Sequence, residues 1–278
     1  MSLATELAAN GWVIVRGAAD PARIAQFRAD LADDIAGTPF SEGLFYGART
    51  QRFGRLLARS PIAADLVLDP VAHGAAQDVI AAGYPHVGLN LTQLIAVHPG
   101  AGAQVPHRDD EMWPIPAPVG EHLLNVLWPL TRFRAENGAT LVWSGSHRGA
   151  PGPVADAPVA AEMDPGDALM MLGSTLHAQG ANRSDEVRSC AVIGYHAAWL
   201  LPIENPWLSY PPDMVAGWPV ELRQLVGYRR LPPNLNGVDC RCPAEMFDAD
   251  IGVRGHGAVD TLWPHQEEGL RRFHALAG

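Results

Sequence analysis

Residues 166–180 read Gly-Asp-Ala-Leu-Met-Met-Leu-Gly-Ser-Thr-Leu-His-Ala-Gln-Gly, an apolar run followed by a histidine just before a glycine turn. A short apolar run between turn residues is typical of a buried strand in an all-β domain. The segment therefore predicts a core strand over residues 168–172, and it delivers one polar side chain, His177, close to the end of that strand.

Similar runs, rich in Leu, Val, Ile and Trp and separated by Gly, Pro and Asn, continue from about Gly88. Strands so short and numerous, without helices between them, indicate antiparallel pairing in a double sheet. We therefore predict an all-β core with flanking helices, a cupin-like jelly roll or double-stranded β-helix. The predicted strands are Leu89–Val97, His122–Leu130, Thr140–Trp143, Ala168–Leu172 and Arg188–Trp199.

The segments on either side of this core have a different pattern. Residues 21–35 carry apolar residues at helical spacing, with Asp20 at an N-cap position and Pro21 at the first helical position. Residues 62–82 repeat the pattern and are interrupted at Pro70, which indicates two shorter helices. Beyond Leu201 the chain is rich in Pro and Trp and is expected to form a partly helical extension that serves as a lid.

This organisation predicts a single catalytic domain over residues 1–278. Its helical part covers about 1–87, its jelly-roll core about 88–200 and its extension about 201–278. The sequence contains no internal repeat and no low-complexity linker, and it does not reveal the oligomeric state.

The composition excludes several classes of function. The formal net charge is -10 with a pI near 5.5, which argues against a nucleic-acid partner because a phosphate backbone demands a broad positive face. All 20 basic residues are Arg, so lysine Schiff-base chemistry, a pyridoxal-phosphate lysine and a Walker-type phosphate loop are excluded. The same composition, rich in Ala, Gly, Pro and Arg, suggests a bacterial source with a GC-rich genome.

The three cysteines are an odd number in a chain too long to need disulfides, which favours a reducing cytoplasm. The first residues lack the positive charge of a signal peptide, and no segment is long and apolar enough to span a bilayer. We expect a cytoplasmic protein without a membrane partner.

A possible metal site begins in the segment Gln104-Val-Pro-His107-Arg-Asp109. Side chains two residues apart on an extended strand point to the same face, so His107 and Asp109 can reach one ion. His177, from a distant strand, completes two histidines and one carboxylate, a set that leaves other positions of the metal open for catalysis. Arg188 follows eleven residues later and returns toward the same place, where its guanidinium can bind a carboxylate through two hydrogen bonds.

Four motifs then occur in order: His107-Arg-Asp109, Glu136-Asn-Gly-Ala-Thr140 followed by Gly145-Ser-His147, Gly166-Asp167 with His177 ten residues later, and Arg188. Over about residues 88–199 this pattern resembles the phytanoyl-CoA dioxygenase family of 2-oxoglutarate oxygenases. Residues 48–53 and 58–61 resemble the subgroup that modifies natural products. Ser144 departs from the family pattern, because many relatives have proline before the Gly-Ser-His segment.

The resemblance implies that His107, Asp109 and His177 bind Fe(II) and act in catalysis, with O2 and 2-oxoglutarate as cosubstrates. It implies that Arg188 binds the distal carboxylate of 2-oxoglutarate. The residues that match further cosubstrate contacts are Gln104, Thr140 and Gln51. Because halogenating members have a small residue in place of the carboxylate ligand, the presence of Asp109 argues against halogenation.

For other polar and aromatic residues the structural interpretation competes with the functional one. We expect His147 to occupy a turn, and Asp110 and Glu111 to be solvated. His86, His98 and His196 have no spacing that supports a function. Most tryptophans are expected in the core, while Trp113 and Trp199 are candidates for the substrate pocket.

By this resemblance the reaction is hydroxylation of a C–H bond in a moderately apolar small molecule, a secondary metabolite, with release of succinate and CO2. Desaturation, epoxidation, cyclisation and endoperoxide formation stay open. An acyl-CoA hydroxylase is an alternative, because arginines could bind the phosphates; these are Arg49, Arg52, Arg55 and Arg59. The rival class is a cupin-like metal-binding isomerase or sensor without oxygen chemistry, which has no need for Arg188.

Overall fold

A computed structural model describes residues 3–81, 83–115, 120–148, 157–247 and 257–277 of the chain. It divides into two compact units, residues 1–205 and residues 206–278. In the first unit the helices are α1 (Leu3–Asn10), α2 (Pro21–Asp30), α3 (Ala32–Gly37), α4 (Ile62–Val67) and α5 (Pro70–Ala81), with short 3₁₀ helices η1 (Leu56–Ala58), η2 (Asp109–Met112) and η3 (Ser146–Arg148). The strands are β1 (Trp12–Val15), β2 (Thr50–Phe53), β3 (Val87–Val97), β4 (Leu123–Pro129), β5 (Thr140–Val142), β6 (Val159–Ala160), β7 (Ala168–Leu172), β8 (His177–Gln179) and β9 (Arg188–Ala197).

The strands form two antiparallel sheets. The large sheet has the order β1-β7-β4-β9-β3-β2, and the small sheet has the order β6-β5-β8. The longest ladder joins β3 to β9, from Val97 opposite Arg188 to Val87 opposite Ala197. Two sheets of antiparallel strands with helices outside confirm the predicted jelly-roll architecture.

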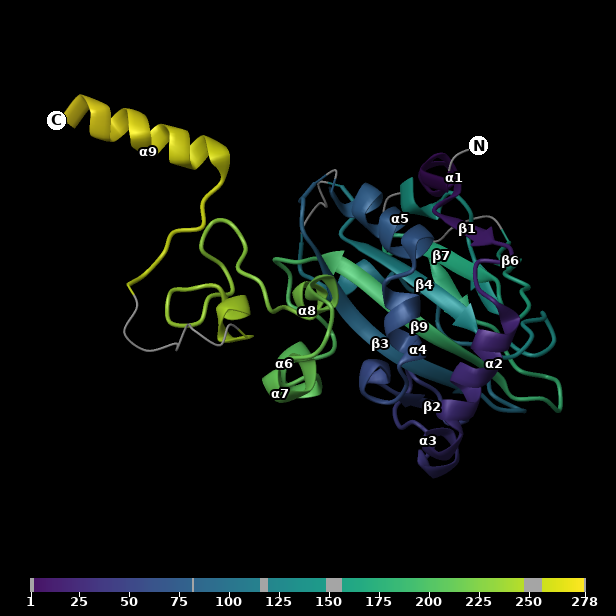
Figure 1. Cartoon of the computed structure of the whole chain (residues 1–278). Helices are drawn as coiled ribbons and strands as arrows, with labels where there is room; N and C mark the ends of the chain where they lie inside the picture. The colour runs from purple at the N-terminus through teal and green to yellow at the C-terminus, as the bar shows by residue number, and fades with distance from the viewer. Residues whose placement is uncertain (1–2, 82, 116–119, 149–156, 248–256, 278) are drawn as a thin grey trace. The chain divides into compact units, whose positions relative to one another are not determined.

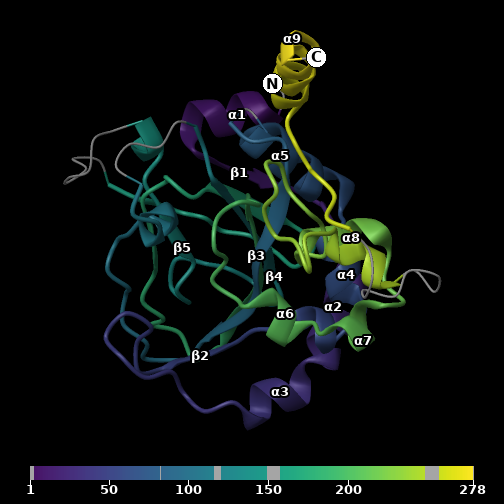
Figure 2. The same ribbon diagram turned by 90° about the vertical axis from the view of Figure 1, so that its left-hand side faces the viewer.

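The two sheets and the helices make successive layers. In Figure 1 the helices α4 and α5 cross one face of the large sheet, and in Figure 2 the strand β5 of the small sheet lies on the other side of β3 and β4. Apolar side chains from both sheets fill the space between them, among them Leu127, Val142, Met171 and Val192. Burial of these side chains is the main force that holds the sheets together.

The predicted strands all form, and Ala168–Leu172 has the predicted bounds. The N-terminal part is less purely helical than predicted, because β1 and β2 each add an edge strand to the large sheet. Each has only four residues, too few for a clear periodicity. The predicted helix over residues 21–35 is interrupted at Leu31, whereas Asp20 caps α2 as predicted by accepting a hydrogen bond from the Ala22 N–H.

The second unit consists of short helices and loops. Its helices are α6 (Pro206–Ser209), α7 (Pro212–Val215), α8 (Val220–Leu225) and α9 (Pro264–Ala277), with the 3₁₀ helix η4 (Pro243–Phe247). This content agrees with the partly helical extension predicted beyond Leu201. None of the helices in the described ranges of the chain combines the length and the apolar character needed to cross a membrane.

Candidate active site

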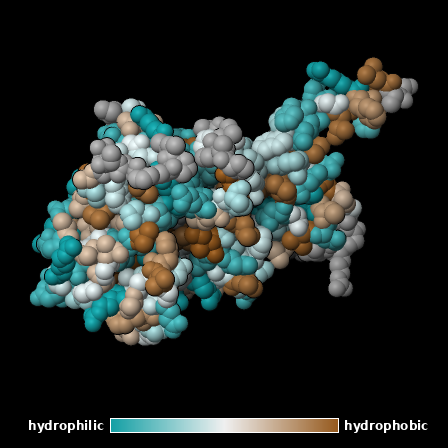
Figure 3. Space-filling view, turned by 180° about the vertical axis from the view of Figure 1, so that it is seen from behind, coloured by the Kyte–Doolittle hydropathy of each residue, from teal (hydrophilic) through white to brown (hydrophobic). Residues whose placement is uncertain are grey.

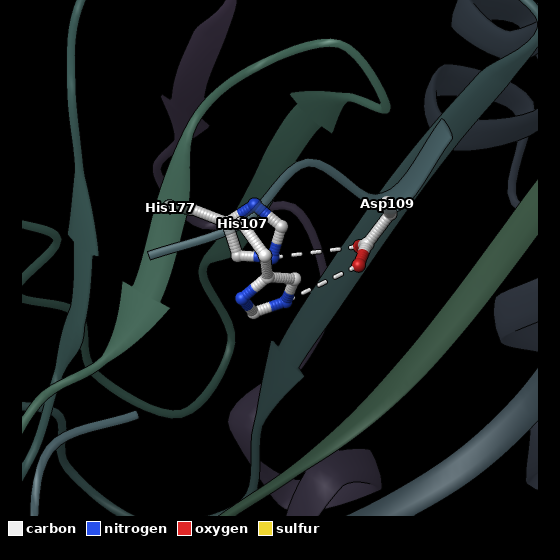
Figure 4. A group of neighbouring side chains, drawn as sticks. All are labelled: His107, Asp109 and His177. Atoms are coloured by element: carbon white, nitrogen blue, oxygen red, sulfur yellow. Dashed lines mark ion pairs between the residues drawn. The ribbon is translucent and has the colours of Figure 1, made fainter. Parts of the chain in front are cut away.

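Three side chains that could bind a metal converge between the two sheets. His107 precedes η2, Asp109 begins it, and His177 begins β8. One carboxylate oxygen of Asp109 lies 3.4 Å from Nε2 of His107, and the other lies 3.4 Å from Nε2 of His177, as Figure 4 shows. One atom from each residue falls within 4.8 Å of the other two, so a single ion can touch all three. The structure thus brings together the residues that the sequence predicted as a set.

Both imidazole rings are oriented by the main chain. Nδ1 of His107 lies 2.9 Å from the carbonyl of Val105, and Nδ1 of His177 lies 3.0 Å from the carbonyl of Thr175. A carbonyl only accepts, so each Nδ1 carries a proton, and Nε2 is the ring nitrogen left to bind a metal. A histidine that binds a metal through Nε2 commonly has its Nδ1–H held by such a hydrogen bond.

The charges of the three residues depend on one another. Burial opposes the charged form of Asp109, but the two histidines outweigh it and lower the pKa of the carboxyl group. Burial lowers the pKa of His177, which favours the neutral imidazole. Burial also opposes the charge on His107, yet the hydrogen bond and charge of Asp109 raise the pKa of His107 above its usual value. An ionised carboxylate beside a neutral imidazole is the state in which such residues bind a cation.

Asn125 on β4 supports the carboxylate, and sequence reasoning missed it. Its Nδ2 donates a hydrogen bond of 2.6 Å to Asp109 Oδ2. Groups that orient metal ligands in this way usually matter for affinity. The only signal in the sequence was an amide inside the apolar run Leu123–Pro129, where it breaks an otherwise hydrophobic strand.

A cavity of about 160 Å³ adjoins the three residues. Its walls come from one face of the large sheet, from β5 and β8 of the small sheet, and from the loop before β2. Strand alternation explains which side chains of the large sheet face the cavity. One row across the strands β4, β9 and β3 consists of Asn125, Gly194 and Leu91, and the next row consists of Leu127, Val192 and Gln93. All of these residues except Gly194 line the cavity.

Arg188 lies inside this cavity and is 2% exposed. Its Nε donates to the carbonyl of Gly138 at 2.9 Å, and its guanidinium stacks over the ring of Phe133 at 4.5 Å. Its Nη1 contacts Cys190 Sγ at 3.9 Å, which is a weak partner. Burial lowers the pKa of Arg188. Arginine nevertheless keeps its charge in proteins, so the cavity holds a buried cation.

A second cavity arginine, Arg52, occupies the place where Gln51 was expected. The register of β2 pairs Gln51 with Ala96 and Arg52 with Ile95, so alternation turns only Arg52 toward the cavity. Gln51 points to the helical side, where its Nε2 donates to the carbonyl of Ile35 and its Oε1 pairs with His98. Gln51 therefore does not line the cavity, as a cosubstrate contact would require, whereas its neighbour Arg52 does.

The other two predicted cosubstrate residues do line the cavity. Thr140 is 4% exposed and lies opposite Gln179 in the small sheet. Gln104 also lines the cavity; its main-chain N–H donates to the carbonyl of Gln179, and its Nε2 donates to the carbonyl of Phe45 at 3.2 Å. Both residues present oxygen or nitrogen atoms within the same enclosed space as Arg188.

Neither tryptophan proposed for the pocket lines this cavity. Trp113 is buried, stacks on His196 and donates its indole N–H to the carbonyl of Leu201. Trp199 is 44% exposed and packs its ring edge-on against Tyr84 and His122. The structure thus places both tryptophans outside the cavity lining.

The remaining polar candidates do not line the cavity. His147 lies in η3 and its Nε2 contacts the carbonyl of Ala8, in agreement with a structural role. Asp110 is half-buried, and burial raises the pKa of its carboxyl group, so the expectation of a fully solvated side chain does not hold. Glu111 is exposed.

The mouth of the cavity carries exposed aromatic side chains. Phe45 and Tyr46 line the cavity while remaining 50% and 45% exposed, and the Phe45 ring packs edge-on against His107 at 4.8 Å. Figure 3 shows, for one face of the molecule, that hydrophobic side chains occur in groups among hydrophilic ones. An apolar ligand would cover Phe45 and Tyr46 on binding.

Comparison with known sequences matches residues 7–190 to the family described as phytanoyl-CoA dioxygenase. The dioxygenase aneA of Aspergillus aculeatus is 30% identical over 244 residues, which is 79% of this chain and 80% of that protein. The dioxygenase trt7 of Aspergillus terreus is 32% identical over 191 residues, or 64% of this chain and 67% of that protein. These relatives are fungal, so they give no support to the bacterial source suggested by composition.

Solved structures share the fold. The non-heme alpha-ketoglutarate-dependent epimerase SnoN from nogalamycin biosynthesis superposes with a TM-score of 0.60 at 22% identity, over 70% of this chain and 81% of that one. HygX from Streptomyces hygroscopicus, solved with nickel, 2-oxoglutarate and hygromycin B, gives 0.58 at 16% identity, over 71% and 87%. Because the family match covers residues 7–190, well over half of its length, the chain belongs to the phytanoyl-CoA dioxygenase family and is a 2-oxoglutarate-dependent non-haem iron dioxygenase.

Proposed function

We propose that this enzyme oxidises, by hydroxylation, a C–H bond of a moderately apolar small molecule, a secondary metabolite, with release of succinate and CO2. One observation carries the proposal: His107, Asp109 and His177 converge in the same cavity as the buried guanidinium of Arg188. A metal ligand set alone would suit many functions, and a buried arginine alone would suit many ligands. Their combination matches a metal and a carboxylate cosubstrate bound side by side.

The three ligands fit iron(II). Two imidazoles and one carboxylate on one side of an ion leave the remaining positions open, as in non-haem iron oxygenases. Both histidines present Nε2 from a fixed tautomer, and Asn125 holds the carboxylate from behind. We assign the iron to His107, Asp109 and His177 on this basis.

The cavity also fits 2-oxoglutarate. We assign its distal carboxylate to Arg188, whose Nη1 has no oxygen acceptor among the described residues. Thr140 and Gln104 are assigned as further contacts, and Arg52 supplies a second positive charge in the same wall. When bound, the metal and cosubstrate would supply the oxidant by oxidative decarboxylation with O2, while the protein orients the ligands and keeps water away.

The cavity walls and the structures of similar proteins support this substrate class. Leu91, Val192, Met112 and Ile203 give the cavity an apolar side, and Phe45 extends it to the surface. HygX was solved with hygromycin B and SnoN with a nogalamycin compound, both small molecules. Because one similar structure is titled an epimerase and another a carbocyclase, other outcomes of the initial oxidation are alternatives to hydroxylation.

The acyl-CoA alternative finds less support. Of the four arginines that could bind its phosphates, Arg49 already donates to the carbonyl of Pro99 and Arg59 to the carbonyl of Gly54. Arg52 points into the cavity and not to the surface. An apolar small molecule therefore remains the better proposal.

The unpaired state of all three cysteines supports a reducing cytoplasm as the location of the protein.

The test is anaerobic addition of Fe(II) and 2-oxoglutarate to the purified protein, followed by its visible absorption. We expect the weak charge-transfer band of the chelated cosubstrate, and we expect Arg188→Ala to lose it at the same concentrations. Arg132→Ala is the matched control, since Arg132 is 75% exposed in its side chain and does not line the cavity. A protein that binds metal and forms no band would instead support the cupin-like isomerase or sensor.

A further inference from the structure

Two buried amides in the cavity wall each have one polar atom without a protein partner. Asn90 on β3 is 0% exposed and Asn125 on β4 is 4% exposed, and both line the cavity. Among the described residues, nothing accepts a hydrogen bond from Asn90 Nδ2 and nothing donates one to Asn125 Oδ1. A buried polar atom without a partner is costly, so each such atom in a native protein calls for an explanation.

The orientation of the Asn125 amide is fixed by chemistry. Its nitrogen lies 2.6 Å from a carboxylate oxygen of Asp109, and an ionised carboxylate can only accept. The amide therefore cannot be rotated to place its oxygen there. The unpartnered Oδ1 is a true acceptor that faces away from Asp109.

The orientation of the Asn90 amide is fixed in the same way. The main-chain N–H of Ile203 donates to Asn90 Oδ1 at 2.9 Å, and only an oxygen can accept this bond. Asn90 Nδ2 is consequently a true donor without a protein partner. The two amides thus offer the cavity one donor and one acceptor.

A β-bulge explains how Asn90 reaches the cavity. Leu89 pairs with Tyr195 and Leu91 pairs with Gly194, so Asn90 is the extra residue between them. Without the bulge, alternation would send consecutive residues to opposite faces, whereas here both Asn90 and Leu91 line the cavity. Bulges commonly redirect a side chain next to an active site.

Gly194 keeps the space around both amides open. It lies between β3 and β4, opposite Leu91 on one side and Asn125 on the other. A Cβ atom built there would come within 2.8 Å of Asn125 Oδ1 and 3.4 Å of Asn90 Cβ. Any side chain at position 194 would therefore crowd the acceptor.

We propose that Asn90 and Asn125 bind a hydroxyl group of the substrate, which accepts from Asn90 Nδ2 and donates to Asn125 Oδ1. This names the substrate as an alcohol whose hydroxyl lies beside Asp109, and it rests on the proposed function. A hydroxyl satisfies both amides at once. A ketone or an ether can accept from Asn90 but leaves the acceptor of Asn125 unpaired, and a site built for hydrogen bonds discriminates against such analogues.

The surroundings agree with a single polar group on an otherwise apolar molecule. Leu91 and Ile203 flank Asn90, while Val192 and Leu127 lie in the next row of the same wall. An anion at this place would lie beside the Asp109 carboxylate, which opposes it. The pair therefore selects a neutral alcohol.

Binding of three cyclohexane derivatives tests the inference. Protein loaded with Zn(II) and 2-oxoglutarate, which is diamagnetic and does not turn over, is titrated with cyclohexanol, cyclohexanone and methoxycyclohexane and followed by NMR. We expect cyclohexanol to bind about fivefold more tightly than methoxycyclohexane, in line with one additional hydrogen bond. We also expect the side-chain NH2 resonance of Asn90 to shift with the alcohol and the ketone.

The variant Asn90→Leu, which has a similar volume, removes the donor that faces the cavity. Cyclohexanol and cyclohexanone should each bind about fivefold more weakly than to the wild type, because each loses the hydrogen bond from Asn90 Nδ2. Gln93→Leu is the matched control: it makes the same amide-to-leucine change on the same strand in the same cavity, and it should leave both affinities unchanged.

Equal affinities for cyclohexanol and methoxycyclohexane in the wild type, or an Asn90 NH2 resonance that stays fixed while other cavity resonances move, would overturn the inference. Both readouts use the wild type, so they decide the matter even if Asn90→Leu does not fold. The Fe(II) and 2-oxoglutarate band is measured separately. A band without alcohol preference rejects this inference alone, and a missing band rejects the proposed function.

Discussion

The main chains of His107 and His177 face each other and exchange two hydrogen bonds, from His107 N to His177 O at 2.9 Å and from His177 N to His107 O at 3.0 Å. Residues directly opposed in this way project their side chains to the same face. Their rings accordingly lie 4.4 Å apart between centroids. The distance between the two imidazole rings is thus set by strand pairing and does not depend on a flexible loop.

Because strand pairing holds both histidines in place without a metal, removing the carboxylate should empty the site and leave the fold intact. We expect Asp109→Ala to lose iron binding and activity together while its circular dichroism spectrum stays that of the wild type. Iron content after desalting measures the loss. His147→Ala, whose imidazole contacts the carbonyl of Ala8 outside the cavity, should retain full iron content. Full turnover by Asp109→Ala would remove this residue from the ligand set.

The hydrogen bond from Asn125 to Asp109 should contribute to metal affinity. We expect Asn125→Leu, which has a similar volume, to weaken Fe(II) binding roughly 10- to 100-fold, because the carboxylate loses its orienting partner. Competition with a chelator of known affinity measures the change. Gln93→Leu makes the same amide-to-leucine change in the same cavity and should bind Fe(II) as the wild type does. An unchanged affinity in Asn125→Leu would assign this hydrogen bond a structural role only.

Thr140 should affect the cosubstrate and not the metal. Thr140→Val keeps the β-branched shape in a small strand and removes one hydroxyl, so we expect the KM for 2-oxoglutarate to rise about fivefold, with iron content unchanged. Succinate release against 2-oxoglutarate concentration measures the shift. An unchanged KM would place the hydroxyl outside the cosubstrate contacts.

Asp167 should make folding stability sensitive to acid. Although burial opposes its charge, hydrogen bonds from the N–H groups of Asp164 and Gly17 and from Arg16 lower the pKa of the Asp167 carboxyl below 3.8. A folded-state pKa below the unfolded one adds stability above the unfolded value, and that stability is lost as the pH falls through the folded value. We expect Asp167→Asn to be about 2 kcal/mol less stable at pH 7, with the difference shrinking below about pH 4. Urea unfolding at several pH values checks both parts, and a difference that does not change with pH would contradict the assignment.

The sequence predicted most of the large sheet and the convergence of His107, Asp109 and His177, because both depend on patterns of long apolar strands and on the spacing of unusual side chains. It missed β1 and β2, which are edge strands of four residues whose pairing is decided by tertiary contacts. Because β2 was missed, Gln51 was assigned to the cavity, whereas Arg52 lines it. Without a known register, alternation cannot say which neighbour faces the cavity.

The polar residues Asn90 and Asn125 were missed for a different reason. Asn90 and Asn125 lie inside apolar runs, where a single amide is read as a tolerated exception. Only the bulge at Asn90 and the position of Asp109 beside Asn125 show that each amide faces the cavity. Such information is absent from periodicity, which averages over several residues.

The bulge in β3 also has an evolutionary consequence. Because the extra residue lies outside the ladder register, position 90 can change without turning Leu91, Gln93 or Ile95 away from the cavity. Related enzymes could therefore acquire new substrate preferences by substitutions at this one position, while the pairing that carries the rest of the wall is inherited unaltered.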